Sequence, residues 1–130
     1  MNHRDTETQR DPLTRAVIGC GIEVHRQLGP GLLESAYEAC LAWELEHHDR
    51  TVERQKSLPV TDKGQTLDVG YRVDLIVDGE LLVELKTVDR IEPVHKAQLL
   101  TYLKLTGLRV GLLMNLNAAT LREGIQRMVH

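Results

Sequence analysis

Residues 71–86 read YRVDLIVDGELLVELK, and this stretch decides the fold of the chain. It predicts two strands joined at Asp78-Gly79, because runs of Val, Leu and Ile flank a pair of residues that favours tight turns. Asp74 and Glu84 interrupt the apolar runs, one in each strand. Burying a carboxylate among such neighbours is costly unless another charge compensates it, and a divalent cation would do so.

The length of the turn decides whether these two carboxylates can meet. Side chains alternate between the two faces of a strand, so the register fixes which of them face each other. A two-residue loop at Asp78-Gly79 would pair Asp74 with Val83 and put Asp74 and Glu84 on opposite faces. A three-residue loop restores the match. We therefore predict a three-residue loop, built from a type I turn with a left-handed glycine and a bulge.

A lysine completes the acidic pair, because Glu84 and Lys86 share one face of their strand. Two carboxylates at roughly 4 Å would repel each other by about 4 kcal/mol at an effective dielectric constant near ~20. Asp74 and Glu84, with the carbonyl of Leu85 and several waters, suit a hard octahedral cation such as Mg²⁺ or Mn²⁺. Lys86 is then available to orient or activate a water, or to stabilise negative charge. The alternative is a partly exposed salt bridge on an edge strand.

A helix is predicted over residues 93–106, since Pro93 suits a first turn and Gly107 suits a helix end. Gln98 and Tyr102 are one turn apart on this helix, and His95 precedes them by another turn. Their side chains can hydrogen-bond to a phosphate or to a water at a metal site. On a helix, Gln and Tyr are usually surface or boundary residues, so their spacing alone is a weak signal.

The rest of the chain supplies helices and strands to the same fold. The predicted elements are a helix from Pro12 to about 28 with Asp11 as its N-cap, a helix over 32–46, strands over 52–60, 66–77 and 81–87, the helix over 93–106, a strand over 109–116, and a helix over 118–128 capped by Asn117. The strands on either side of the 93–106 helix are expected to be parallel. This order, αα-βββ-α-β-α, predicts an α/β fold with a mixed sheet flanked by helices.

Composition limits the classes of protein that fit. A chain of 130 residues with 42% hydrophobic residues suits one domain, over residues 11–130, after a mobile polar tail at residues 1–10. Cys20 and Cys40 lie among apolar residues on helix faces, so neither a disulfide nor a zinc motif is predicted, and the six histidines form no metal motif either. No apolar run is long enough for a membrane, and the first residues do not resemble a signal peptide. We therefore expect a cytoplasmic protein that does not bind membranes.

The net charge of −3 argues against indiscriminate binding of nucleic acid, which depends on many phosphate contacts. It does not exclude a nuclease, because basic side chains on one side of a cleft could contact a nucleic acid locally. An even scatter of solvated charges is the alternative, and the sequence does not distinguish the two.

Together these residues resemble the PD-(D/E)XK metal-dependent nucleases, whose signature is an Asp on one strand and an E-x-K pair on the next. Gln98 and Tyr102 resemble the Q-x-x-x-Y helix of the RecB-like exonuclease branch. Residues 31–37, GLLESAY, match the motif that names the GxxExxY proteins, and the likeness extends over most of the chain from about residue 13. The resemblance implies a restriction-endonuclease-like core. Val73 stands where the superfamily signature has Pro.

The resemblance also implies a function and roles. It implies hydrolysis of phosphodiesters in nucleic acid, expected to be DNA, with Mg²⁺ or Mn²⁺ as the cofactor. The implied metal ligands are Glu34, Asp74, Glu84 and the carbonyl of Leu85, and the implied catalytic residues are Asp74, Glu84, Lys86, Gln98 and Tyr102. Glu34 stands in the first turn of its helix, where the helix dipole favours any acid, so an ordinary helix-start residue is the alternative. Relatives by fold often act as homodimers, but the sequence marks no interface.

A non-catalytic binding or assembly module that keeps the nuclease fold is the alternative function. In such a module the polar cluster would be a buried salt-bridge network. Cleavage of nucleic acid in the presence of Mg²⁺ or Mn²⁺ would distinguish the two.

Overall fold

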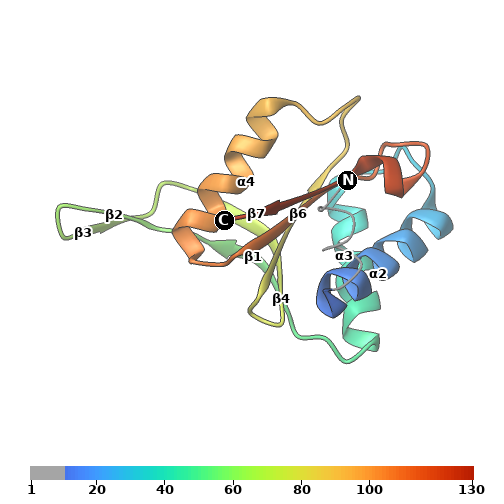
Figure 1. The fold of residues 1–130 in the computed structure, drawn as a ribbon, viewed down its shortest axis with the longest axis horizontal. Helices are drawn as coiled ribbons and strands as arrows, with labels where there is room; N and C mark the ends of the chain where they lie inside the picture. Colours follow the sequence, from blue (N-terminus) through green and yellow to red (C-terminus); the bar gives the residue numbers. More distant parts are fainter. Residues whose placement is uncertain (1–10) are drawn as a thin grey trace.

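A central β-sheet with helices on both faces forms the body of the molecule in a computed structural model, which describes residues 11–130 (Figure 1). The elements are α2 (Pro12–Leu28), α3 (Glu34–His47), β1 (Val52–Ser57), β2 (Val60–Asp62), β3 (Gln65–Leu67), β4 (Arg72–Val77), β5 (Leu81–Lys86), α4 (Pro93–Thr106), β6 (Val110–Asn115), a 3₁₀ turn η1 (Leu121–Gly124) and β7 (Ile125–Val129). The main sheet has the order β1-β4-β5-β6-β7. Because β5 and β6 are parallel and the other pairs antiparallel, the predicted mixed α/β sheet is confirmed. The predicted tail at residues 1–10 lies outside the described residues.

Helices α2 and α4 begin where the sequence predicts, whereas α3 begins at Glu34, two residues after the predicted start. Asp11 caps α2, since its carboxylate accepts the main-chain N–H groups of Leu13 at 3.1 Å and Thr14 at 3.3 Å. These bonds satisfy donors that no helical carbonyl can reach. The C-terminal end of α4 is also as predicted, because the helix is capped by Gly107, whose φ of 74° lies in the left-handed region.

The β4–β5 hairpin has the predicted loop length. Residues 78–80 form a three-residue loop, because Val77 pairs with Leu81. The turn type differs from the prediction, since Asp78 (φ 55°) is left-handed as well as Gly79 (φ 65°). An Asp tolerates this conformation better than most residues when its side chain is bonded locally.

The carboxylate of Asp78 is bonded in this way by the two residues that precede β1. It accepts the N–H of Thr51 at 2.8 Å and pairs with Arg50 at 2.9 Å. Both bonds favour the ionised carboxylate, and the bond from Thr51 is the largest cause that lowers the pKa of Asp78. The hairpin tip is therefore fastened to the rest of the sheet.

The predicted helix over residues 118–128 is wrong. This segment forms η1 and then β7, which runs antiparallel to β6. A Cβ on Gly124 would lie 2.4 Å from the main-chain oxygen of Asn115, so the chain passes β6 too closely for any other residue. Pairing with β6, whose residues are almost all buried, overrides the local helical pattern.

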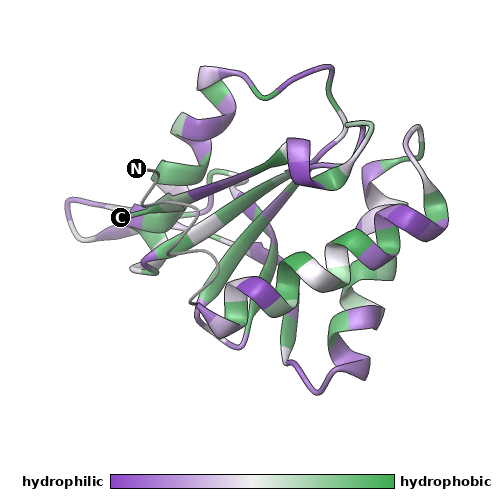
Figure 2. Ribbon diagram, turned by 45° about the vertical axis from the view of Figure 1, so that its right-hand side comes forward, coloured by the Kyte–Doolittle hydropathy of each residue, from purple (hydrophilic) through white to green (hydrophobic). Residues whose placement is uncertain are grey.

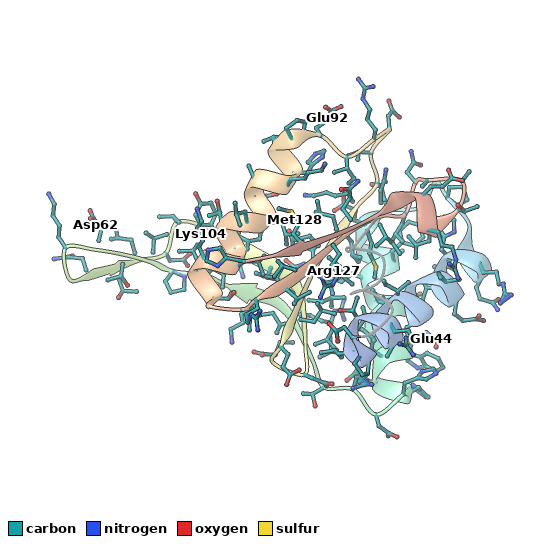
Figure 3. All side chains as sticks on the ribbon, viewed as in Figure 1. Glu44, Asp62, Glu92, Lys104, Arg127 and Met128 are labelled. Carbon is teal, nitrogen blue, oxygen red and sulfur yellow. The ribbon has the colours of Figure 1, made fainter. Side chains whose placement is uncertain are left out.

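The long strands predicted over 52–60 and 66–77 are each interrupted. The first predicted strand breaks after β1, and the second breaks before β4. The segments between these breaks, β2 and β3, form a separate two-stranded hairpin. Figure 1 shows this hairpin projecting away from the body, and Figure 3 places Asp62 near its far end. Gly70, with a φ of 84°, separates β3 from β4.

Two apolar clusters hold the layers together, one on each face of the sheet. Figure 2 shows hydrophobic residues running along the central strands. The α2–α3 face carries Val17, Val24, Tyr37, Leu41, Leu45, Leu75, Val83, Leu85 and Met114, and the α4 face carries Val73, Ile76, Leu82, Leu99, Tyr102, Leu103 and Leu113. No helix within residues 11–130 has the length and apolar character needed to cross a membrane. Cys20 and Cys40 are both free thiols, as predicted.

Candidate active site

The candidate site lies where β4 and β5 part. The paired ladder between them ends at Leu75 and Val83. At the next position the Glu84 carboxylate accepts the N–H of Asp74 at 2.7 Å, and the Asp74 carboxylate accepts the N–H of Leu85 at 2.8 Å. These reciprocal bonds point both acids into the gap between the strands and fix their orientation. The two acids of the predicted pair are therefore brought together.

The path of β4 changes at Asp74. Val73 and Ile76 pack in the cluster on the α4 face, whereas Leu75 packs in the cluster on the α2–α3 face. Regular alternation would have placed Val73 with Leu75. The break in alternation accompanies the turning of the Asp74 N–H toward Glu84, so the acids meet through a local distortion as well as through the hairpin register.

Burial changes the ionisation of this pair. Glu84 is 4% exposed, and its burial, followed by the charge of Asp74, raises its pKa to about 8, although the N–H of Asp74 and the ammonium of Lys86 act in the opposite direction. Burial also raises the pKa of Asp74, while the bond from Leu85 lowers it. A cation beside the pair would favour the ionised form of both acids. The donor set thus fits a divalent cation bound by oxygen ligands.

The carbonyl of Leu85 is directed to the same place. In a strand the N–H and C=O of one residue point to the same side. Because the N–H of Leu85 points to Asp74, its carbonyl also faces the end of β4, next to the acidic pair. This direction suits the ligand role expected from the sequence.

A chain of polar contacts joins β5 to α4. The Lys86 ammonium lies 3.5 Å from Gln98 Oε1, and Gln98 Nε2 donates to the Tyr102 hydroxyl at 3.0 Å. Tyr102 is buried, and its burial, followed by the charge of Glu84, raises its pKa, so the phenol remains neutral at ordinary pH. The structure therefore brings Lys86, Gln98 and Tyr102 together on the α4 side of the acids.

Glu34 lies near the acidic pair but outside its first contacts. It is exposed in the first turn of α3, and its carboxylate accepts the hydroxyl of Thr87 at 3.4 Å. Its charge contributes to the raised pKa values of both Asp74 and Glu84. However, among residues 11–130 these three acids do not form a group with ligand atoms within 4.8 Å of one another. Glu34 would have to rotate its side chain to share an ion with them.

Glu38, one turn after Glu34 on α3, is a buried acid that was not predicted from the sequence. Glu38 is 6% exposed, and its Oε2 accepts from Arg54 Nε at 3.1 Å and Nη2 at 3.0 Å. Its Oε1 accepts from the Gln55 amide, which also donates to Asp74 Oδ1 at 3.2 Å. Gln55 thereby links Glu38 to the acidic pair. The spacing of four residues from Glu34 was the available sequence signal for Glu38.

Gln55 has an unusual backbone. Its φ is 51°, and it falls between the pairs Arg54↔Leu75 and Lys56↔Val73, across from Asp74. A non-glycine residue in this region costs about 1–3 kcal/mol and persists where the surroundings hold it. No sequence pattern marks such a position, so the distortion at Gln55 could be found only in the structure.

Tyr37, the last residue of the GLLESAY stretch, fastens the loop before α3. Its hydroxyl donates to the carbonyl of Gly29 and accepts the N–H of Leu32 at 3.2 Å. The Tyr37 side chain is fully buried. The phenol thus ties the glycine-rich loop to the helix that carries Glu34 and Glu38.

A sequence model of the PD-(D/E)XK nuclease superfamily matches residues 11–128 of the chain. The match runs from the N-cap of α2 into β7 and includes every residue of the candidate site. No curated protein and no solved structure matches the chain.

Proposed function

Because this chain belongs to the PD-(D/E)XK nuclease superfamily, we propose that it is a divalent-metal-dependent phosphodiester hydrolase acting on DNA. The observation that carries the proposal is the pairing of Asp74 and Glu84 in the gap between β4 and β5, with Lys86 beside them. Glu84 is buried and Asp74 is partly buried, both have raised pKa values, and a bound cation would supply the positive charge that favours their ionised forms.

Each residue of the site has a role in this proposal. Asp74, Glu84 and the Leu85 carbonyl hold Mg²⁺ or Mn²⁺, and Glu34 joins them from α3. The ion, when bound, polarises the phosphate and lowers the pKa of a water. Lys86 orients the attacking water and stabilises negative charge on the phosphate. Gln98 positions the Lys86 ammonium, and Tyr102 holds the Gln98 amide in place.

We place the chain among the GxxExxY proteins, with features of the RecB-like branch. Residues 31–37 support this proposal, because Tyr37 fastens the loop that leads into α3 and the charge of Glu34 contributes to the raised pKa values of Asp74 and Glu84. The contact between Gln98 and Tyr102 supports the branch assignment, because the Q-x-x-x-Y spacing lets Tyr102 hold the Gln98 side chain that contacts Lys86.

One observation favours the second candidate, a non-catalytic binding module. The acids are satisfied within the chain: Asp74 and Glu84 accept main-chain N–H groups, and Glu38 is paired with Arg54. Such a network is stable without a cation when Glu84 is protonated. In this case metal ions would bind weakly, or would bind without supporting hydrolysis.

The test is cleavage of supercoiled, linear double-stranded and single-stranded DNA, with RNA in parallel, in Mg²⁺, in Mn²⁺ and in a chelator. We expect cleavage of DNA that requires the metal. Lys86→Ala should retain the thermal shift caused by the metal but lose turnover, whereas Asp74→Ala should lose both. Lys104→Ala is the matched control, since Lys104 is an exposed lysine on α4.

Three outcomes would contradict the proposed hydrolysis. Cleavage that persists in the chelator, or that is unchanged in Asp74→Ala, would show that another activity is being measured. A metal-dependent thermal shift with no cleavage of any of these substrates would favour the binding module.

A further inference from the structure

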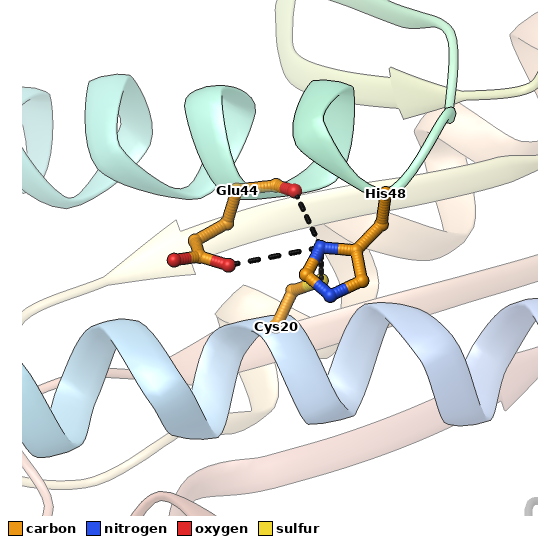
Figure 4. Close-up of side chains that lie close together, drawn as sticks. All are labelled: Cys20, Glu44 and His48. Carbon is orange, nitrogen blue, oxygen red and sulfur yellow. Dashed lines mark hydrogen bonds and ion pairs between the residues drawn. The ribbon is translucent and has the colours of Figure 1, made fainter.

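Three potential metal ligands meet where the end of α3 lies against α2. Figure 4 shows the side chains of Cys20 from α2, and of Glu44 and His48 from the end of α3, turned toward one another. His48 Nδ1 lies 3.8 Å from Cys20 Sγ and 3.7 Å from Glu44 Oε2. All three ligand atoms lie within 4.8 Å of one another. Because Cys20 and His48 are 28 residues apart in sequence, local spacing did not reveal this cluster.

The two separations that involve His48 Nδ1 are close to those of a tetrahedral zinc site. Bonds of about 2.3 Å to sulfur and about 2.05 Å to nitrogen, set at the tetrahedral angle, put sulfur and nitrogen about 3.6 Å apart. The same construction puts nitrogen and a carboxylate oxygen about 3.4 Å apart. The observed 3.8 and 3.7 Å exceed these values by only about 0.2–0.3 Å. Small side-chain rotations would close that difference.

The donor set selects the metal. A thiolate, an imidazole and a carboxylate suit zinc or a similar borderline transition ion, whereas Mg²⁺ prefers oxygen ligands alone. We propose that Cys20, Glu44 and His48 bind one Zn²⁺ ion, with water as the fourth ligand. The charges of the thiolate and the carboxylate then neutralise the ion.

Two proton shifts accompany binding. Without metal, His48 Nδ1 lies 2.9 Å from the main-chain oxygen of Glu44, which places a proton on Nδ1. The His48 side chain is 62% exposed, so its proton can move to Nε2 with little loss of solvation. Cys20 gives up its thiol proton to the solvent, since the metal binds the thiolate.

The zinc site is separate from the candidate active site. Glu44 is ten residues beyond Glu34 on α3, which corresponds to about 15 Å along the helix axis. A metal bound by Cys20, Glu44 and His48 would connect α2 to α3 and raise the free energy of unfolding of the chain. It would not take part in phosphodiester hydrolysis.

Cobalt titration of the full chain, freed of metal by a chelator, tests the proposal. Co²⁺ should bind in a ratio of one to one and give a thiolate-to-cobalt charge-transfer band together with the visible bands of a tetrahedral complex, and Zn²⁺ should abolish both. Cys20→Ser and His48→Ala should each weaken binding by about tenfold or more. Cys40→Ser is the matched control, because Cys40 is the other thiol and lies outside the cluster. Asp74→Ala should keep the bands, which separates this site from the Mg²⁺ site.

Absence of a thiolate band, or bands of equal strength in His48→Ala and the unmodified chain, would overturn the proposal. Loss of the bands in Cys40→Ser would do so as well. If Cys20→Ser does not fold, His48→Ala and Glu44→Gln decide the question, because His48 is exposed and Glu44 is partly exposed.

Discussion

The raised pKa of Glu84 makes a prediction about stability in the absence of metal. Burial and the charge of Asp74 move this pKa from 4.5 to about 8, so the folded state favours the protonated carboxyl. The resulting stability is fully present below about pH 4.5 and is lost as the pH rises through about 8. The loss has a slope of about 1.4 kcal/mol per pH unit and a total of at most about 5 kcal/mol.

Glu84→Gln tests this reasoning directly. Glutamine keeps an oxygen that can accept the N–H of Asp74, but it does not ionise, so the variant should lose the part of the slope that comes from Glu84. Metal-free Glu84→Gln should therefore be more stable than the unmodified chain at pH 8, by a few kcal/mol. The free energy of unfolding is measured in urea from pH 5 to pH 8 in the presence of a chelator. Added Mg²⁺ should stabilise the unmodified chain and leave the variant unchanged, because the ion requires the carboxylate.

Glu80→Gln is the matched control, since Glu80 is an exposed acid in the same hairpin. It should keep the full pH dependence. Equal slopes in Glu84→Gln and the unmodified chain would refute the assignment of the raised pKa to Glu84. A metal-free chain whose stability did not change between pH 5 and pH 8 would refute the burial argument as a whole.

Three further variants test other parts of the structure. Gln55→Ala removes the amide that joins two carboxylates, and we expect metal affinity to fall by about tenfold in calorimetry, with Gln65→Ala on the projecting hairpin unchanged. Tyr37→Phe removes both bonds to the loop before α3 and should lower the free energy of unfolding in urea by about 1–3 kcal/mol. A stability equal to that of the unmodified chain would show that the phenol only packs. Gly124→Ala forces a Cβ to within 2.4 Å of a main-chain oxygen, so the melting temperature should drop and the amides of β7 should exchange faster with deuterium. An unchanged exchange rate would count against the pairing of β7 with β6.

The parts of the site that could be predicted carry their signals within short stretches. Asp74, Glu84 and Lys86 are polar residues in strands that are otherwise apolar, and the three-residue loop followed from the requirement that the acids meet. Pro93 and Gly107 marked the ends of α4 and so the position of its polar flank. Each of these inferences depends on residues that are close in sequence and that stay close to one another in the folded chain.

The parts that escaped prediction depend on distant segments. Nothing local shows that Gln55 adopts a positive φ and bonds Glu38 and Asp74, because its partners come from α3 and β4. The C-terminal residues have a helical pattern, but the open edge of β6 offers hydrogen bonds that a strand can use. The cluster around Cys20 likewise arises from the packing of α2 against α3.

The three-residue tip of the β4–β5 hairpin has a consequence for how the gene can change. Losing or gaining one codon there would leave two strands able to pair, while every side chain of one strand would exchange its inward and outward positions relative to the other. Changes of an even number of residues would keep the parity. Where the acidic pair is kept, we therefore expect insertions and deletions at residues 78–80 to involve an even number of residues. A related protein with an odd change there should have lost the pair.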